Sequence, residues 1–410
     1  PTAEPMVNIV SLGQCTGGQA NNLTTPGVLR HAYNIAGQGD SENTQWVVTS
    51  SAGAAHSPSD LTQFDTTFGL PSATVVCPAC SSTQTVGLES NLDVEYIHAI
   101  SPTTTTLDNM ASKGTNFYSE NQFLSRWIKN LWCAAMDPQD RDSFFHGQLP
   151  DNLCESPPVV VSISWAVRES DVTDVSIELF NYYASYAGLL GVTLVAASGD
   201  GGAGDVQEAD SCGKSYEPLF PASSPYVTAV GATQGIESGL PEVACSAGTG
   251  ASITSGGGFS TMQSAMPWQT SAIAGYLGSA VGKAAHTGYT ASGRGYPDLA
   301  IAGHNYQVVS GGQMRVVDGT SASAPVFAAM VANVVAARKA QDTSAVDLVR
   351  GVNTGCTHPS RPGAPNFALL RTTARGLTRR VVGWLPRRLS RLAQPHPLSL
   401  EQRARLSRHH

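Results

Sequence analysis

In the middle of the chain the sequence reads Pro158-Val159-Val160-Val161-Ser162-Ile163-Ser164-Trp165. This almost continuous run of apolar, β-branched residues predicts a strand that is buried on both faces of a parallel sheet. Residues 174–190 then have the composition of a helix, residues 191–197 form a second apolar strand, and residues 224–230 a third. A strand, a helix and a strand at this spacing predict a βαβ unit with a right-handed crossover, and therefore an α/β fold.

The second predicted strand ends in Ser198-Gly199-Asp200-Gly201-Gly202. Functional sites of open α/β sheets lie at the carboxyl ends of the strands, which makes Asp200 a candidate site residue. Ordinary turn chemistry explains the same residues, because Asp and Gly both favour turns.

A candidate nucleophile lies in Gly319-Thr320-Ser321-Ala322-Ser323-Ala324-Pro325, which precedes an Ala-rich apolar run. Pro325 is tolerated in the first turn of a helix, so Ser321 is predicted at a helix N-terminus. The unpaired N–H groups and the positive dipole end there would suit a nucleophilic serine and its oxyanion. A Ser/Thr-rich helix cap is the plainer interpretation.

A pair of acidic residues lies in the segment 85–100, where Leu88, Leu92 and Tyr96 recur four apart, as on one stripe of a helix. Glu89 and Asp93 are also four apart, so they project from one helix face as neighbours. A solvated face is the bland explanation of such a pair, but the apolar surroundings favour a packed helix.

Other segments complete a coarse map of the chain. Short helices are predicted at 25–33, from Asp60 onward and around 121–135, a short strand after 291–298, and a hairpin within 306–317. The expected organisation is an extended N-terminal arm at 1–25, one domain at 26–370 and a basic, disordered tail at 371–410.

The composition is that of a globular chain of 410 residues with 41% hydrophobic residues, and no run of about 18 apolar residues predicts a membrane span. Ten Arg and one acidic residue lie in 371–410, which leaves 14 Lys and Arg against 30 Asp and Glu before them. Such an acidic body repels itself less at low pH. The basic tail lacks aromatic interleaving, so a nucleic-acid partner is not predicted, and a splice or reading-frame artefact is an alternative origin for it.

The eight cysteines are an even number and are scattered, which indicates an oxidising compartment. Cys77-Pro-Ala-Cys80 has the spacing of half a zinc site, but no second Cys or His pair matches it, and no zinc is predicted. The disulfide pairing stays open.

Ser321 requires a base, and none of the ten histidines lies in a context typical of a Ser-His-Asp triad. Carboxylates, in contrast, are available in Glu89, Asp93 and Asp200. At this point six motifs, in one order, resemble the sedolisin family, the serine-carboxyl peptidases that include tripeptidyl-peptidase 1. They are Gly87-Leu88-Glu89-Ser90-Asn91-Leu92-Asp93-Val94-Glu95-Tyr96, Ala197-Ser198-Gly199-Asp200, Phe220-Pro221-Ala222-Ser223-Ser224-Pro225-Tyr226-Val227, Ser255-Gly256-Gly257-Gly258-Phe259-Ser260, Gly293-Arg294-Gly295-Tyr296-Pro297-Asp298 and Gly319-Thr320-Ser321-Ala322-Ser323-Ala324-Pro325.

The resemblance implies a subtilisin-like, doubly wound α/β domain with a mostly parallel sheet and helices on both faces, which cleaves peptide bonds at acidic pH. It implies Ser321 as nucleophile, Glu89 as general base, Asp93 as the carboxyl that orients it, and Asp200 as the oxyanion residue. Substrate binding is assigned to Ser255, Gly256 and Gly257. The expected partners are peptide or polypeptide substrates and, in the precursor, an N-terminal prosegment, and the chain is interpreted as a mature form in a secreted, lysosomal or vacuolar compartment.

The C-terminal part departs from the family pattern. A calcium site is expected from the family, but Gly351 stands where its first Asp should be, and a later Gly-Trp-Asp segment is missing. No calcium ligand, and no other metal ligand, is therefore assigned. Asp318 replaces the Ser that commonly precedes Gly319, and its charge is expected to perturb the titration of the site.

Three hypotheses follow for the function. The first is an acid-acting serine-carboxyl peptidase. The second is a catalytically impaired relative that lacks the calcium site. The third is a neutral protease of the subtilisin type with a histidine base.

Overall fold

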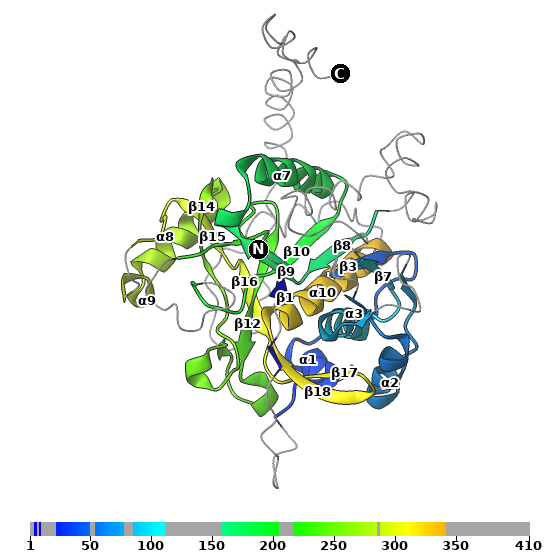
Figure 1. Ribbon diagram of the computed structural model, residues 1–410. Helices are drawn as coiled ribbons and strands as arrows, with labels where there is room; N and C mark the ends of the chain where they lie inside the picture. Colours follow the sequence, from blue (N-terminus) through cyan, green and yellow to red (C-terminus); the bar gives the residue numbers. More distant parts are fainter. Residues whose placement is uncertain are drawn as a thin grey trace, which may run out of the picture. The chain divides into compact units, whose positions relative to one another are not determined.

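A central sheet organises the protein (Figure 1). The computed structural model describes residues 4–5, 8–9, 22–49, 54–77, 85–110, 157–204, 216–284 and 288–341. Seven strands of the sheet follow the order β13-β12-β10-β8-β3-β7-β5, and β16 also pairs with β12. Every pair is parallel except β12 with β13, which confirms the predicted α/β fold with a mostly parallel sheet. These strands are β3 (Thr44–Thr49), β5 (Val75–Val76), β7 (Thr105–Met110), β8 (Val160–Ile163), β10 (Thr193–Ala197), β12 (Thr228–Gln234), β13 (Val243–Ala244) and β16 (Leu299–Ala302).

Both faces of the sheet are covered, because successive side chains of a strand point to opposite sides. In β10, Val195 and Ala197 pack into the larger core, and Leu194 and Ala196 pack into a second core on the other face. Helix α7 (Asp174–Leu189) closes the second core. It links β8 to the parallel neighbour β10, as the predicted βαβ unit requires (Figure 1).

Helices α3 (Leu88–Ile100) and α10 (Thr320–Ala340) cover the other face and pack against each other (Figure 1). Every residue of α3 from Glu89 to Ile100 is buried. The helix lies among α10, β3, α2 (Pro58–Phe68) and β17 (Tyr306–Ser310), so it has no solvated face. The expected packing of this segment is confirmed, and the acidic pair on it is enclosed.

Helix α10 begins at Thr320, which places Ser321 in its first turn as predicted. The expected place of Pro325 was wrong, because this residue lies beyond the first turn, inside the helix. A proline there cannot donate to the Ser321 carbonyl, and packing of α10 on β8, β10, β12 and α3 sustains the helix instead. Helix α10 is long enough and, with a mean hydropathy of 1.5, apolar enough to cross a membrane. However, 83% of its most apolar 18-residue stretch is buried inside the protein, as in a core helix.

Other predicted elements are found with shifted ends. The third strand begins at Thr228 rather than at 224, because its pairing with β10 starts there and the preceding residues form turns. The predicted hairpin is β17 with β18 (Gln313–Asp318), whose turn has Gly311 and Gly312 at positive φ. The predicted short helix near residue 30 is α1 (Pro26–Ala32), where Thr25 caps the N-terminus. The predicted helix at 121–135 and the tail at 371–410 lie outside the described residues.

The expected extended arm contributes two short strands: β1 (Glu4–Pro5) pairs with β9 (Trp165–Arg168), and β2 (Asn8–Ile9) pairs with β18. The remaining elements are β4 (Ala54–Ala55), β6 (Thr85–Val86), β11 (Leu219–Phe220), β14 (Gly258–Ser264), β15 (Gly293–Tyr296), α8 (Thr270–Gly278) and α9 (Ala280–Ala284).

Candidate active site

Three distant segments meet at the carboxyl edge of the sheet. Ser321 lies in the first turn of α10, Glu89 lies in the first turn of α3, and Asp200 follows the end of β10. All three are buried. The Ser321 hydroxyl and the charge of Asp200 both act on the Glu89 carboxyl, so the structure brings together the residues that the sequence singled out.

Glu89 and Asp93 form a buried acidic pair one helical turn apart. Burial raises the pKa of Glu89 well above its usual value, and the charges of Asp93 and Asp200 raise it further, against the opposing effect of the Ser321 and Ser164 hydroxyls. Burial also raises the pKa of Asp93. Because like charges at close range resist ionising together, the two carboxyls titrate as a coupled pair.

Ser164 orients this pair from the sheet. It follows the end of β8, and its hydroxyl donates to Oδ1 of Asp93 at 2.6 Å. The other Asp93 oxygen is buried without a hydrogen-bond partner among the described residues. Such atoms are costly in a folded core and are typical of a site that completes its bonding with a ligand.

The Asp200 carboxyl is held through one oxygen only. Its Oδ1 accepts from the backbone N–H of Thr320 at 2.8 Å and from the Thr320 hydroxyl at 2.9 Å. Its Oδ2 is buried without a described partner. Burial raises the pKa of Asp200 to about 7, although the two Thr320 bonds oppose the shift. In acid the carboxyl therefore carries a proton, and Oδ2 is the oxygen available to hold it.

The predicted substrate segment lies against the Asp200 turn. The N–H of Gly256 donates to the Gly199 carbonyl, and the Ser198 hydroxyl donates to the Gly256 carbonyl at 2.8 Å. A Cβ on Gly256 would lie 2.5 Å from the carbonyl oxygens of both Ser198 and Gly199, so only glycine allows this approach. Next to it, the Ser255 hydroxyl is bound to the backbone of β12: its Oγ accepts from the Ala232 N–H at 3.0 Å.

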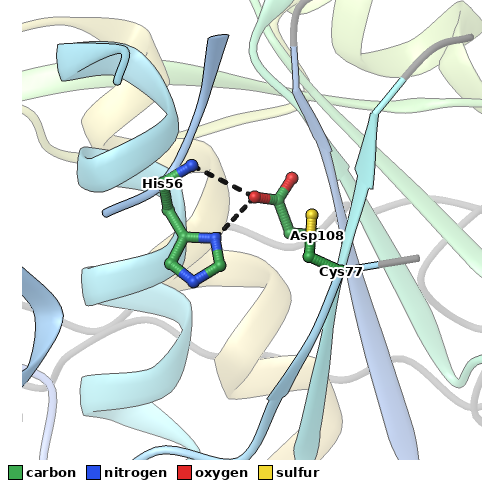
Figure 2. A group of neighbouring side chains, drawn as sticks. All are labelled: His56, Cys77 and Asp108. Carbon is green, nitrogen blue, oxygen red and sulfur yellow. Dashed lines mark hydrogen bonds and ion pairs between the residues drawn. The ribbon is translucent and has the colours of Figure 1, made fainter. Parts of the chain in front are cut away.

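One group of described side chains has the spacing of a metal site. Figure 2 shows His56, Cys77 and Asp108, whose candidate ligand atoms lie within 4.8 Å of one another. Cys77, however, is disulfide-bonded and cannot supply the thiolate that a metal would bind. His56 Nδ1 is directed to Asp108 at 2.6 Å, and its backbone N–H donates to the same oxygen (Figure 2). The group is explained as a buried His–Asp pair beside a disulfide. The residues around Gly351, where the family calcium site was expected, lie outside the described part of the chain.

Two further His–Asp pairs occur among the described residues, His98 with Asp65 at 3.3 Å and His304 with Asp318 at 2.8 Å. A His–Asp pair would be part of a Ser-His-Asp triad only if the histidine served the serine. The serine hydroxyl instead acts on the Glu89 carboxyl. The histidine-base hypothesis therefore gains no support from these pairs.

Comparison with known proteins shows the family of the chain. The sequence profile described as the subtilase family matches residues 147–355, about half of the chain. The chain is a sedolisin-like member of the subtilase family. This sedolisin-like chain is 38% identical over 212 residues to physarolisin of Physarum polycephalum. The aligned region covers 44% of this chain and 37% of physarolisin. It is 32% identical over 314 residues to tripeptidyl-peptidase 1 of Mus musculus. That aligned region covers 74% of this chain and 50% of the mouse protein.

A solved structure supports the fold of the sedolisin-like chain. Pseudomonas sedolisin, a serine-carboxyl proteinase complexed with two molecules of pseudo-iodotyrostatin, superposes with a TM-score of 0.58 at 21% identity. The match covers 82% of this chain and 86% of the sedolisin chain. The expected subtilisin-like fold is confirmed. The chain spans only about half the length of tripeptidyl-peptidase 1 and a smaller share of physarolisin.

Sequence reasoning missed two residues of the candidate site. It noted Ser164 only as part of a strand, yet this residue contacts Asp93, which lies 71 positions earlier. It noted Thr320 only as a neighbour of Ser321, yet Thr320 holds Asp200. The position of Ser164 directly after a buried strand, like that of Asp200, was the available signal.

Proposed function

We propose that the protein is an acid-acting serine-carboxyl peptidase that hydrolyses peptide bonds through an acyl-enzyme on Ser321. Glu89 is the general base, Asp93 orients it, and Asp200 stabilises the oxyanion. The backbone of Ser255–Gly257 binds the peptide next to the Asp200 turn. The observation that carries the proposal is the burial of three carboxyl groups around a serine at a helix N-terminus, with raised pKa values.

Acylation begins when the Ser321 hydroxyl oxygen attacks the carbonyl carbon of the scissile bond and its proton passes to Glu89. The carbonyl oxygen becomes an oxyanion, to which protonated Asp200 donates a hydrogen bond from Oδ2. Glu89 then returns the proton to the amine as the C–N bond breaks, which leaves the acyl group on Ser321. Positioned donors of this kind lower the barrier because they act where charge develops.

Deacylation repeats the sequence with water. A water molecule attacks the acyl carbon while Glu89 takes its proton, and Asp200 again donates to the oxyanion. Collapse of this intermediate breaks the bond to Ser321, whose oxygen recovers the proton from Glu89, and the acid product leaves.

The working pH follows from the two carboxyl functions. The Glu89–Asp93 pair must lose enough protons for Glu89 to accept one, whereas Asp200 must keep its proton in order to donate. Since Asp200 has a pKa of about 7, activity falls as pH rises through that range. The acid limb belongs to the coupled pair, so a bell-shaped profile on the acidic side of neutrality is expected.

The test is a pH–rate profile of the full chain on a mixed peptide library, beside Ser321→Ala and Glu89→Gln. Acid-side activity that both substitutions abolish supports the proposal, and undiminished activity in Ser321→Ala sinks it. Masses of the products also report the cleavage mode: tripeptides released from free N-termini indicate a tripeptidyl-peptidase, and internal fragments indicate an endopeptidase.

An acidic, oxidising compartment suits this chemistry, so we assign the protein to a secreted, lysosomal or vacuolar location. The disulfide at Cys77 and the raised carboxyl pKa values support this assignment. An N-terminal prosegment is the proposed partner of the precursor, because its relatives include tripeptidyl-peptidase 1.

The alternative function is a catalytically impaired relative, favoured by Gly351 at the place of the first expected calcium ligand. Calcium that binds only the folded protein would raise its melting temperature. A thermal melt with calcium and with a chelator, run beside the activity assay, separates the alternatives. A folded protein without calcium response and without activity supports the impaired relative.

A further inference from the structure

Asp318 ends β18, directly before the helix that carries Ser321, and its buried carboxyl joins three segments. Its Oδ2 accepts from the backbone N–H of Ser252 at 2.6 Å. Its Oδ1 accepts from the N–H of Asn305 at 2.7 Å and from Nδ1 of His304 at 2.8 Å. Neither carboxylate oxygen is left unpaired.

The segment that begins at Ser252 leads to the proposed substrate residues. Two positions later the Thr254 N–H donates to the Asp200 carbonyl at 2.9 Å, and the chain continues into Ser255–Gly257. On the other side, the Gly319 N–H donates to the Gly303 carbonyl at 2.9 Å. Asp318 is therefore the joint between the substrate segment, the turn at 303–305 and the start of α10.

The charge of Asp318 also reaches the oxyanion residue. Burial would raise the pKa of Asp318, but its hydrogen bonds with His304 and with the Asn305 and Ser252 N–H groups lower it below its usual value. Asp318 thus stays ionised where Asp200 is protonated, and its charge contributes to the raised pKa of Asp200. Among the described residues, the other titratable groups near these two carboxyls are His304, Glu89 and Cys245, and Glu237 acts on His304 and Cys245.

We propose that Asp318 is a positioning residue for the peptidase reaction: its two carboxylate oxygens fix the substrate segment to the start of the nucleophile helix. Its negative charge lies two residues before Thr320, which binds Asp200, and therefore acts on Asp200 while His304 moderates it. This inference rests on the proposed function. A neutral serine at this position would supply neither the two-oxygen anchorage nor the charge.

Asp318 and His304 shift the pKa of Asp200 in opposite directions. Replacing Asp318 by a neutral residue removes a negative charge, so Asp200 loses its proton at lower pH. Burial lowers the pKa of His304 but its bond and charge interaction with Asp318 raise it overall, so the imidazole is protonated in acid. Replacing His304 removes a positive charge, so Asp200 keeps its proton to higher pH.

The experiment follows the Asp200 carboxyl directly in the full chain labelled with ¹³C at the aspartate carboxyl carbons, with the Asp200 resonance assigned by its loss in Asp200→Asn. Asp318→Asn should lower the Asp200 midpoint by about one pH unit, and His304→Gln should raise it by a similar amount. Asp65→Asn is the matched control, because it alters a buried His–Asp pair that does not act on Asp200. Its Asp200 midpoint should stay at the wild-type value.

The same variants are assayed on peptides, where the alkaline limb of kcat/KM should move with the midpoint, and Asp318→Ala should raise KM at least about tenfold. An unchanged Asp200 midpoint in folded Asp318→Asn, or, if that variant does not fold, in His304→Gln, overturns the charge role. An unchanged KM in folded Asp318→Ala overturns the anchoring role. A wild-type chain without peptidase activity refutes the proposed function, whereas the carboxyl titration still decides the electrostatic inference.

Discussion

Thr320 holds the Asp200 carboxyl from one side, donating both its backbone N–H and its hydroxyl to Oδ1 at 2.8 and 2.9 Å. The residue before the proposed nucleophile therefore fixes the proposed oxyanion residue, and the first turn of α10 carries both functions. Because Oδ1 is occupied by donors, a proton on this carboxyl belongs on Oδ2. The Thr320 hydroxyl in turn accepts from the Gly199 N–H at 3.0 Å, which ties the β10 turn to the same point.

This arrangement predicts different outcomes for two substitutions of Asp200. Asp200→Ala removes the donor and should lower kcat about 10²- to 10³-fold with little change in KM. Asp200→Asn keeps a permanent N–H donor in place of the acid proton, so it should retain more activity than the alanine variant. It should also lose the alkaline limb that belongs to Asp200. Steady-state kinetics between pH 3 and 8 measure both effects, and equal rates for the two variants would contradict the donor role.

The hydrogen bond from Ser164 to Asp93 predicts a shift of the acid limb. It favours the charged carboxylate, so Ser164→Ala should raise the pKa of the Glu89–Asp93 pair by about one pH unit, equivalent to about 1.4 kcal/mol. The acid limb of kcat/KM should move upward accordingly. Ser162→Ala is the control, because this buried serine lies two positions earlier, in β8, and its hydroxyl has no described hydrogen-bond partner. A limb that stays in place in folded Ser164→Ala argues against the pair as the base.

The close contact of Gly256 with the Asp200 turn predicts a strict requirement for glycine. Gly256→Ala places a Cβ 2.5 Å from two backbone carbonyl oxygens, so the segment must shift away. We expect KM for peptides to rise about tenfold or more and the melting temperature to fall, with a loss of about 1–3 kcal/mol as for overpacking. At Gly258 the nearest atom to a new Cβ lies 3.7 Å away, so Gly258→Ala should behave like the wild type. Similar kinetics for both variants would show that the segment does not hold the substrate.

The raised carboxyl pKa values predict that the protein is most stable in acid. Glu89, Asp93 and Asp200 bind protons more tightly when folded, so their contribution is fully present below the unfolded pKa values near 4. This contribution to stability is lost as pH rises through the pKa values of the folded protein, and burial raises that of Asp200 to about 7. The melting temperature should therefore fall between about pH 4 and pH 7, and Asp200→Asn should make the decline shallower. Melts of equal slope in both proteins would refute this source of the pH dependence.

The sequence predicted those elements whose signal is local. The apolar runs at 158–165 and 191–197 with a helix between them gave adjacent parallel strands joined by α7, because both faces of such strands are buried whatever surrounds them. The turn of the β17–β18 hairpin was marked by two glycines that adopt positive φ. The start of the third strand was misplaced by four residues, since β12 begins where its partner β10 provides hydrogen bonds, and composition does not record that.

The amino-acid sequence by itself determined which residues are candidates for the site: Ser321 at a helix start, Glu89 and Asp93 one turn apart, and Asp200 at a strand end. Each of these placements relates a residue only to its own helix or strand, and the geometry of a helix or strand is local. Only the tertiary structure decided that α3 is buried on every side, that Ser164 reaches Asp93, and that Asp318 joins the substrate segment to the nucleophile helix. Those relations connect residues 66 to 71 positions apart, and they set the electrostatics of the site, because burial and neighbouring charge act through space rather than along the chain.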